Sequence, residues 1–165
     1  MALATTIYRV VSVDTCSGSA KKYAECVFNV FGGAVYRGPY IGCSKSSIYF
    51  GGAGIDQIGK IWVDSMDFSS ISGFTPAPGS VIMMSCHAST GNIWIGHNGT
   101  WYNSGNPDTE TNPTGTLGTG TFYIMSGIAV IEGLPQVNGL KSSLRTQLSQ
   151  FTFTKPTGDS SWSGV

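Results

Sequence analysis

The stretch that decides the fold is Asn92-Ile-Trp-Ile-Gly-His-Asn-Gly-Thr-Trp101. Asn98 and Gly99 stand at its turn, and a type I′ hairpin turn needs a positive φ at both central positions, which Asn and Gly tolerate best. Trp94 and Trp101 flank the turn, where their indole rings can bury large apolar areas on the two strands. We therefore predict a tight β-hairpin with Trp94, Asn98, Gly99 and Trp101 as its structural residues.

Short runs rich in β-branched and aromatic residues continue on both sides of this hairpin, separated by Gly, Ser, Asn and Pro. A spacing of roughly 8–12 residues between such runs is typical of an all-β sandwich or barrel. The runs predict strands at Ile7–Val13, Tyr23–Phe31, Tyr40–Cys43, Ser47–Phe50, Lys60–Val63, Val81–Cys86, Asn92–Ile95, Thr121–Met125, Ile128–Ile131 and Gln150–Thr154. At most one short helix fits, at Gly139–Ser149, where Leu140, Leu144 and Leu148 recur every four residues.

The composition limits the classes of function. The 165 residues are one domain's worth, so we expect a single domain over residues 1–165. Only 11% of the residues are charged, against about 25% in an average soluble protein. Nine basic residues balance nine acidic ones, so the chain lacks the basic surface that nucleic-acid binding requires. A net charge near zero removes the repulsion between copies, which suits a subunit assembled in multiple copies.

Targeting signals are also missing from the sequence. No run of about 18 apolar residues predicts a membrane span. The first residues, Met1–Val11, contain neither the basic region nor the apolar region of a secretory signal. We therefore expect synthesis in a cytoplasm.

The hairpin also carries a family resemblance. Trp94-Ile-Gly-His-Asn-Gly-Thr-Trp101, followed by Gly105-Asn-Pro107, resembles the SPRY domain, and more narrowly the SPRY-like domains of bacteriophage virion proteins. Weaker matches to the same family occur in order along the chain, at Lys22–Glu25, Gly79–Ile82 and Phe151–Gly158, so the resemblance covers about residues 21–158. It implies a two-sheet antiparallel sandwich of the SPRY or concanavalin-like jelly-roll type, with a non-enzymatic role.

The resemblance and the composition together suggest a structural protein of the virion. Our first hypothesis is a surface-displayed decoration, collar or appendage subunit that binds neighbouring capsid or tail proteins after synthesis in the host cytoplasm. One alternative is a tail-fibre-type module that attaches to a glycan or protein of the host surface. Another is a cytoplasmic protein-interaction SPRY module, and a fourth is a glycan-processing enzyme on a concanavalin-like sandwich.

Aromatic and polar residues in loop-like stretches are the candidates for binding, because aromatic side chains are enriched at interfaces and also stack on sugar rings. The segment Asn103–Gly120 is a long polar loop, and loops of that length are usually functional. The predicted binding residues are Tyr36, Arg37, Tyr40, Trp101, Tyr102, Asn103 and Asp108, and Trp162 is a further aromatic residue of the same kind.

The remaining reactive residues indicate no catalytic or metal site. The four cysteines, Cys16, Cys26, Cys43 and Cys86, lack the spacing of a zinc site or a redox motif, so we expect buried thiols. The alternative is a disulfide formed in the finished particle, with Cys16, beside a Ser/Gly turn, as the exposed candidate. We expect His87 and His97, the only histidines, to lie at the surface or to cap turns.

The acidic residues show no glycosidase-like pair. Asp108 and Glu110 share the long loop without the spacing of a calcium site. We therefore expect no enzyme activity, no metal and no cofactor.

Overall fold

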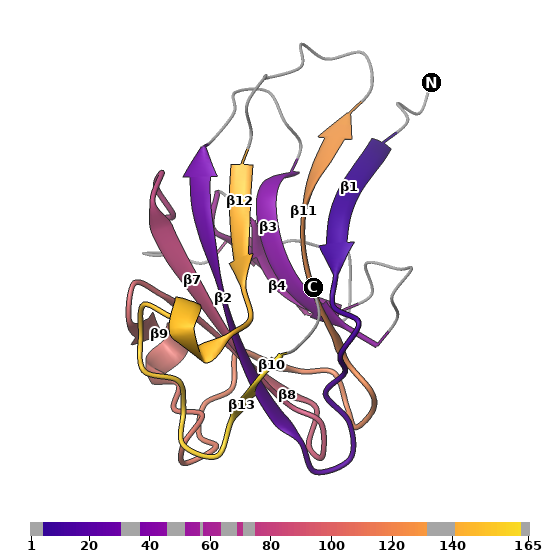
Figure 1. Cartoon of the computed structure of the whole chain (residues 1–165), viewed down its shortest axis with the longest axis vertical. Helices are drawn as coiled ribbons and strands as arrows, with labels where there is room; N and C mark the ends of the chain where they lie inside the picture. The colour runs from indigo at the N-terminus through magenta and orange to yellow at the C-terminus, as the bar shows by residue number, and fades with distance from the viewer. Residues whose placement is uncertain are drawn as a thin grey trace.

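The computed structural model describes residues 5–30, 37–45, 52–56, 58–63, 69–70, 75–131 and 141–162. These residues form two β-sheets that face each other (Figure 1). No helix in this part of the chain is long and apolar enough to cross a membrane. The two facing sheets confirm the predicted two-sheet antiparallel sandwich.

One sheet has six strands and the other seven. The first runs in the order β1 (Thr5–Val11), β11 (Tyr123–Ile131), β3 (Arg37–Ser44), β4 (Gly52–Asp56), β5 (Lys60–Val63) and β6 (Ser69–Ser70). The second runs in the order β10 (Gly115–Thr116), β8 (Asn92–His97), β7 (Ser80–His87), β2 (Lys21–Val30) and β12 (Lys141–Arg145). At its margins β9 (Thr100–Trp101) pairs with β8, and β13 (Ser160–Ser161) pairs with β2 in parallel.

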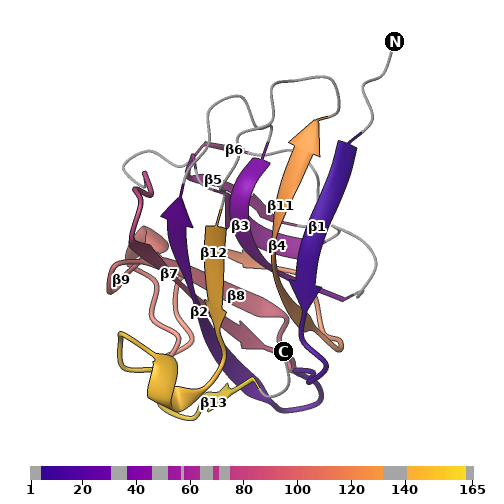
Figure 2. The same ribbon diagram turned by 45° about the horizontal axis from the view of Figure 1, so that its top comes forward.

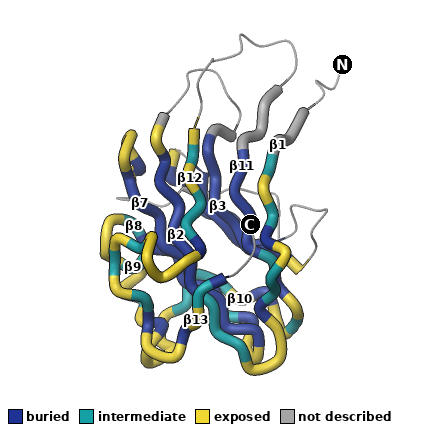
Figure 3. Tube along the Cα trace, viewed as in Figure 1, coloured by how far each residue is buried: buried dark blue, intermediate teal, exposed yellow. Residues whose placement is uncertain are grey.

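The core lies between the sheets, and the central strands are buried along most of their length (Figure 3). β2 contributes Ala24, Cys26 and Phe28 to this core, and β7 contributes Ile82 and Met84. Because side chains alternate across a strand, Tyr23 and Glu25 of β2 belong to the opposite face. They are buried as well, so the outer face of the second sheet must be covered by another part of the chain.

The predicted hairpin is confirmed. β8 pairs with β9 through Gly96 with Trp101 and His97 with Thr100, and the turn residues Asn98 and Gly99 have φ values of 47° and 87°. Asn98 Oδ1 accepts a hydrogen bond of 2.9 Å from the Val81 amide, which ties the turn to β7. Local turn chemistry is therefore sufficient to place this part of the fold.

The structure corrects three predicted elements. The helix expected at Gly139–Ser149 is wrong, since Lys141–Arg145 is strand β12 and only Leu148–Gln150 forms a 3₁₀ turn, η2. The strand expected at Gln150–Thr154 is absent, because its backbone bonds to a side chain instead of to a neighbouring strand. The runs Thr121–Met125 and Ile128–Ile131 belong to one strand, β11. The run predicted at Ser47–Phe50 lies outside the described residues.

Candidate binding site

Residues 151–162 lie along the outer face of the second sheet. Figure 2 shows this segment beside the lower end of β2, where it leads from η2 to β13. Under it lie Tyr23 and Glu25 of β2 together with Ser85 and His87 of β7, all with no exposed area. Buried polar groups need hydrogen-bond partners, and here the C-terminal segment provides them.

Glu25 anchors the start of this segment. Its Oε2 accepts a hydrogen bond of 2.8 Å from the Thr152 amide, and its Oε1 accepts one of 2.8 Å from the Phe153 amide. The Tyr23 hydroxyl donates to Oε1 over 2.9 Å, and Arg145 Nη1 lies 3.5 Å from Oε2. A carboxylate with this many charge-assisted bonds holds the backbone at residues 152–153 firmly in place.

Asp159 anchors the end of the segment. Ser85 Oγ donates to its Oδ2 over 2.7 Å, and His87 Nε2 lies 3.2 Å from its Oδ1. Ser, His and Asp are the residue types of a nucleophilic triad, but a triad needs a bond between serine and histidine and access for a substrate. Here the carboxylate lies between Ser85 and His87, and all three side chains are buried, so the geometry is that of an anchor.

The long polar loop holds the middle of the segment. Asp108 accepts a hydrogen bond from the Thr157 amide, and the neighbouring Glu110 pairs with Lys21 on β2. That ion pair lowers the pKa of the Glu110 carboxyl below its usual value, with the hydrogen bond from Lys21 as the largest cause. The loop and the C-terminal segment are thus tied to each other and to the sheet.

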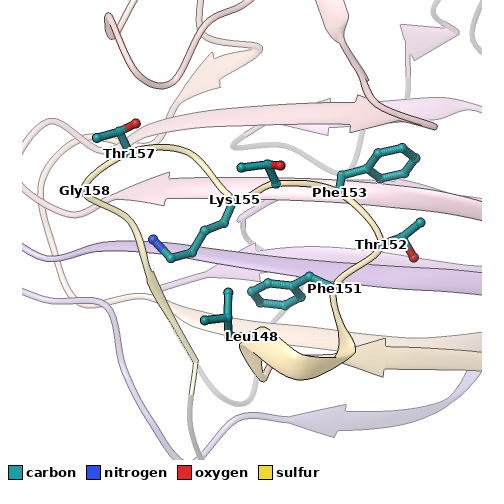
Figure 4. Close-up of a pocket in the computed structure, with 8 residues that line it drawn as sticks. Leu148, Phe151, Thr152, Phe153, Lys155, Thr157 and Gly158 are labelled. Carbon is teal, nitrogen blue, oxygen red and sulfur yellow. The ribbon is translucent and has the colours of Figure 1, made fainter.

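Between these anchors the segment curves around an open pocket with a volume of about 610 Å³ (Figure 4). Pockets that bind ligands usually measure about 300–1,000 Å³. Figure 4 shows Leu148 and the Phe151 ring on one side of the pocket, and the Lys155 side chain directed into the space between Gly158 and Leu148. The lining residues are Leu148, Phe151, Thr152, Phe153, Thr154, Lys155, Thr157 and Gly158.

The rings of the pocket are packed against the sheet and the hairpin. Phe151 meets Tyr23 edge-to-face with 4.8 Å between the ring centroids, and Tyr23 meets Trp101 in the same way at 6.3 Å. Phe153 lies against the hairpin turn, where a side chain on Gly99 would meet its ring at 3.0 Å. The pocket wall is therefore supported by aromatic contacts as well as by the carboxylates.

Two residues of the predicted binding set are linked to this pocket: Trp101 through Tyr23, which packs on Phe151, and Asp108. Trp101 and Tyr102 are half-buried, and Asn103 is exposed with a φ of 55°. Asp108 reaches the pocket wall through its bond to Thr157. Tyr102 packs instead against the core between the sheets. The role of all four residues in binding stays a prediction.

The other predicted residues lie elsewhere. Tyr36 is outside the described residues, and Arg37 begins β3, where it pairs with Ala129 of β11. Tyr40 lies in a strand, as the run Tyr40–Cys43 predicted, but its expected place at the binding surface is wrong, because it is 1% exposed in β3 and packs edge-to-face on Trp62. This burial raises the pKa of the Tyr40 hydroxyl to about 12. Trp162 is also buried rather than in a surface loop.

The expected exposure of Cys16 is wrong as well. Cys16 is fully buried, and its thiol donates to the Ala20 carbonyl over 3.2 Å. Cys43 and Cys86 lie near it with 3.5 Å between their sulfur atoms, and all four cysteines are free thiols. The prediction of buried thiols is thus confirmed, and Cys16 is not the exposed disulfide candidate.

The two histidines lie in different environments. His87 is completely buried against Trp94, 4.5 Å between ring centroids, so its predicted surface position is wrong. His97 is half-buried, and its Nε2 lies 2.9 Å from Ser80 Oγ. Desolvation lowers the pKa of His97. Across the described ranges, no three His, Cys, Asp or Glu side chains are grouped as metal ligands.

Sequence reasoning missed the pocket, because the alternation of Phe151 and Phe153 predicted a strand there. One signal was present: Glu25 stands in the middle of an apolar strand, and a buried carboxylate implies a partner segment. The sequence alone does not identify that segment.

Comparison with protein-family models and with curated proteins finds no match. Among solved structures, the SPRY domain of human HERC1 is similar, with a TM-score of 0.51 over 78% of this chain and 85% of that chain. The two sequences are 11% identical, so the likeness concerns the fold. The chain has a SPRY-like β-sandwich.

Proposed function

We propose that this chain is a non-enzymatic protein-interaction domain, and that in a bacteriophage particle it is a surface subunit bound to neighbouring virion proteins. The observation that carries the proposal is the open pocket on the outer face of a SPRY-like sandwich. Its walls are held by Glu25 and Asp108, so the pocket is formed before a partner arrives. A preformed site loses less conformational entropy on binding than a site that must order itself.

The chemistry of the lining supports a protein partner. Phenyl rings, an exposed leucine and several hydroxyl groups together resemble the mixed apolar and polar character of protein interfaces. The grouping with catalytic residue types, Ser85, His87 and Asp159, is sealed from solvent and lacks the serine–histidine bond. Both observations favour binding over catalysis.

The virion role is supported by the sequence that forms the pocket. Phe151–Gly158 is one of the segments that resemble the bacteriophage SPRY-like domains, and it supplies most of the lining. The low charge of the chain also suits a subunit fixed among neighbours.

Quantitative mass spectrometry tests the proposal by measuring the copy number of this chain in purified particles of the phage that encodes it. We expect many copies per particle, and particles lacking the chain should break more readily on heating or osmotic shock. A few copies at the tail end would favour attachment to a host surface glycan or protein instead. Absence from the particle would contradict the virion role and favour a cytoplasmic interaction module.

A further inference from the structure

The pocket carries a positive charge, which comes from Lys155. Lys155 is the only charged residue of the described lining, and no residue in the described part of the chain bonds to its Nζ. The nearby charged groups have other partners. Arg145 donates a hydrogen bond to Thr152 and lies beside Glu25. Asp108 accepts a hydrogen bond from the Thr157 amide. The pocket therefore presents an uncompensated ammonium group.

An apolar surface lies beside this ammonium group. Leu148 is 64% exposed on η2, and the half-buried Phe151 ring lies next to it in the pocket (Figure 4). Covering such a surface is favourable by roughly 25 cal/mol for each Å² of apolar area removed from water. The site thus offers an apolar contact and a cation within one pocket.

We propose that the pocket binds a peptide segment of the partner protein in which an apolar residue stands next to Asp or Glu. The apolar side chain packs on Leu148 and Phe151, and the carboxylate pairs with Lys155 Nζ. The hydroxyl groups of Thr154 and Thr157 can bond to the peptide backbone. A neutral sugar would leave the ammonium group without a partner, which favours the acidic peptide. This inference rests on the proposed function and names the chemistry of its partner.

Selection of a random heptapeptide library on the immobilised full chain tests the inference. We expect the recovered peptides to carry Asp or Glu beside Leu, Ile, Met or Phe. A synthetic peptide of the recovered sequence, blocked at both ends, then serves as the probe in a titration. Its affinity should fall as the salt concentration rises, because an exposed ion pair is screened by salt.

Variants of the chain separate the two contacts. Lys155→Gln should weaken binding of the probe roughly fivefold, the usual upper range for an exposed ion pair. Changing the acidic residue of the probe to its amide should cost the same factor, with no further loss in Lys155→Gln. Leu148→Ser should weaken binding about tenfold through lost apolar contact. Lys141→Gln, at the far end of β12, is the matched control and should bind as the wild-type chain does.

Several outcomes would overturn the inference. These are recovered peptides without an acidic residue, unchanged affinity in Lys155→Gln, or no enrichment of any peptide. Binding of an oligosaccharide of uronic acids without peptide enrichment would assign the pocket to a glycan. If the chain is abundant in the particle while Lys155→Gln has no effect, the proposed function stands and this peptide chemistry fails.

Discussion

Replacing Glu25 with glutamine should release the segment that forms the pocket. The carboxylate of Glu25 accepts hydrogen bonds from the Thr152 amide, the Phe153 amide and the Tyr23 hydroxyl, and it has no exposed area. Glutamine has nearly the same shape but only one acceptor oxygen. The variant therefore changes the hydrogen bonding of this site without leaving a cavity.

The size of the effect follows from the geometry. The best orientation keeps the glutamine oxygen at Oε1, where Tyr23 and Phe153 donate, and places its NH₂ group against the Thr152 amide. One charge-assisted bond, worth about 1.5–3 kcal/mol, is lost, and a buried N–H group is left without an acceptor. Arg145 also loses its charge partner, 3.5 Å away. We expect the free energy of unfolding to fall by about 3–5 kcal/mol.

Urea unfolding measures this loss, and amide hydrogen exchange locates it. The amides of Thr152 and Phe153 should lose protection in the Glu25→Gln variant beyond the loss expected from its global stability. Glu110→Gln is the control, since its side chain is 38% exposed and should contribute less than about 1 kcal/mol. A loss below about 1 kcal/mol in Glu25→Gln, with unchanged protection at Thr152 and Phe153, would refute the reasoning.

Three further predictions concern the core. Gly54→Ala should destabilise the fold by about 1–3 kcal/mol, because a Cβ there would lie 2.4 Å from the Trp62 ring. Gly120→Ala is the control, since its Cβ would meet only the flexible side chain of Lys45. Thermal unfolding compares the two variants, and equal losses of stability would contradict this packing. All four cysteines should resist a thiol reagent in the native chain and react after unfolding in urea; a native thiol that reacts at once would contradict their burial. The free energy of unfolding should fall as pH rises above about 9. Burial raises the pKa of Cys26 from 9.0 to about 11 and that of Tyr40 from 10.0 to about 12. The unfolded chain therefore loses these protons at a lower pH than the folded chain does. Cys26 alone should account for about 2–3 kcal/mol by pH 11, measured by urea unfolding across pH, and a flat profile from pH 8 to 11 would contradict this.

Local chemistry predicted some elements well. The turn at Asn98 and Gly99 needs two positive φ values, and few residues other than Asn and Gly accept them, so the hairpin could be placed from the sequence. The strands β2, β7 and β8 could also be predicted, because strands buried in the sandwich are written as apolar runs in the sequence.

Elements that depend on distant partners could not be predicted. β4 is Gly52-Ala-Gly-Ile-Asp56, and its small residues have low strand propensity. They are needed because the Trp62 ring packs directly against Gly54, a contact that only the fold creates. The supposed helix at Gly139–Ser149 failed for a related reason: Leu144 packs on the core from strand β12, whereas Leu148 is exposed on η2.

The candidate site shows the same division. Trp101 and Asp108 were predicted near a functional loop and are linked to the pocket, while Tyr40 was predicted as a binding residue and is buried in β3. Phe151 and Phe153 alternate as strand residues do. The backbone amides of this segment, however, donate their hydrogen bonds to the carboxylate of Glu25 and not to a neighbouring strand. A bond between residues so far apart in the chain is set by the fold and has no local signal.

Photo-cross-linking from the pocket, in the bacteriophage particle to which the proposed function assigns this chain, tests the central claim most directly. A photoreactive amino acid replaces Leu148, whose exposed side chain lines the pocket, and in a second preparation it replaces Lys141, which is exposed at the far end of β12. We predict a single major adduct with a neighbouring virion protein from position 148 and none of that kind from position 141. Equal labelling from both positions, or no protein adduct from position 148, would contradict a binding role for this pocket.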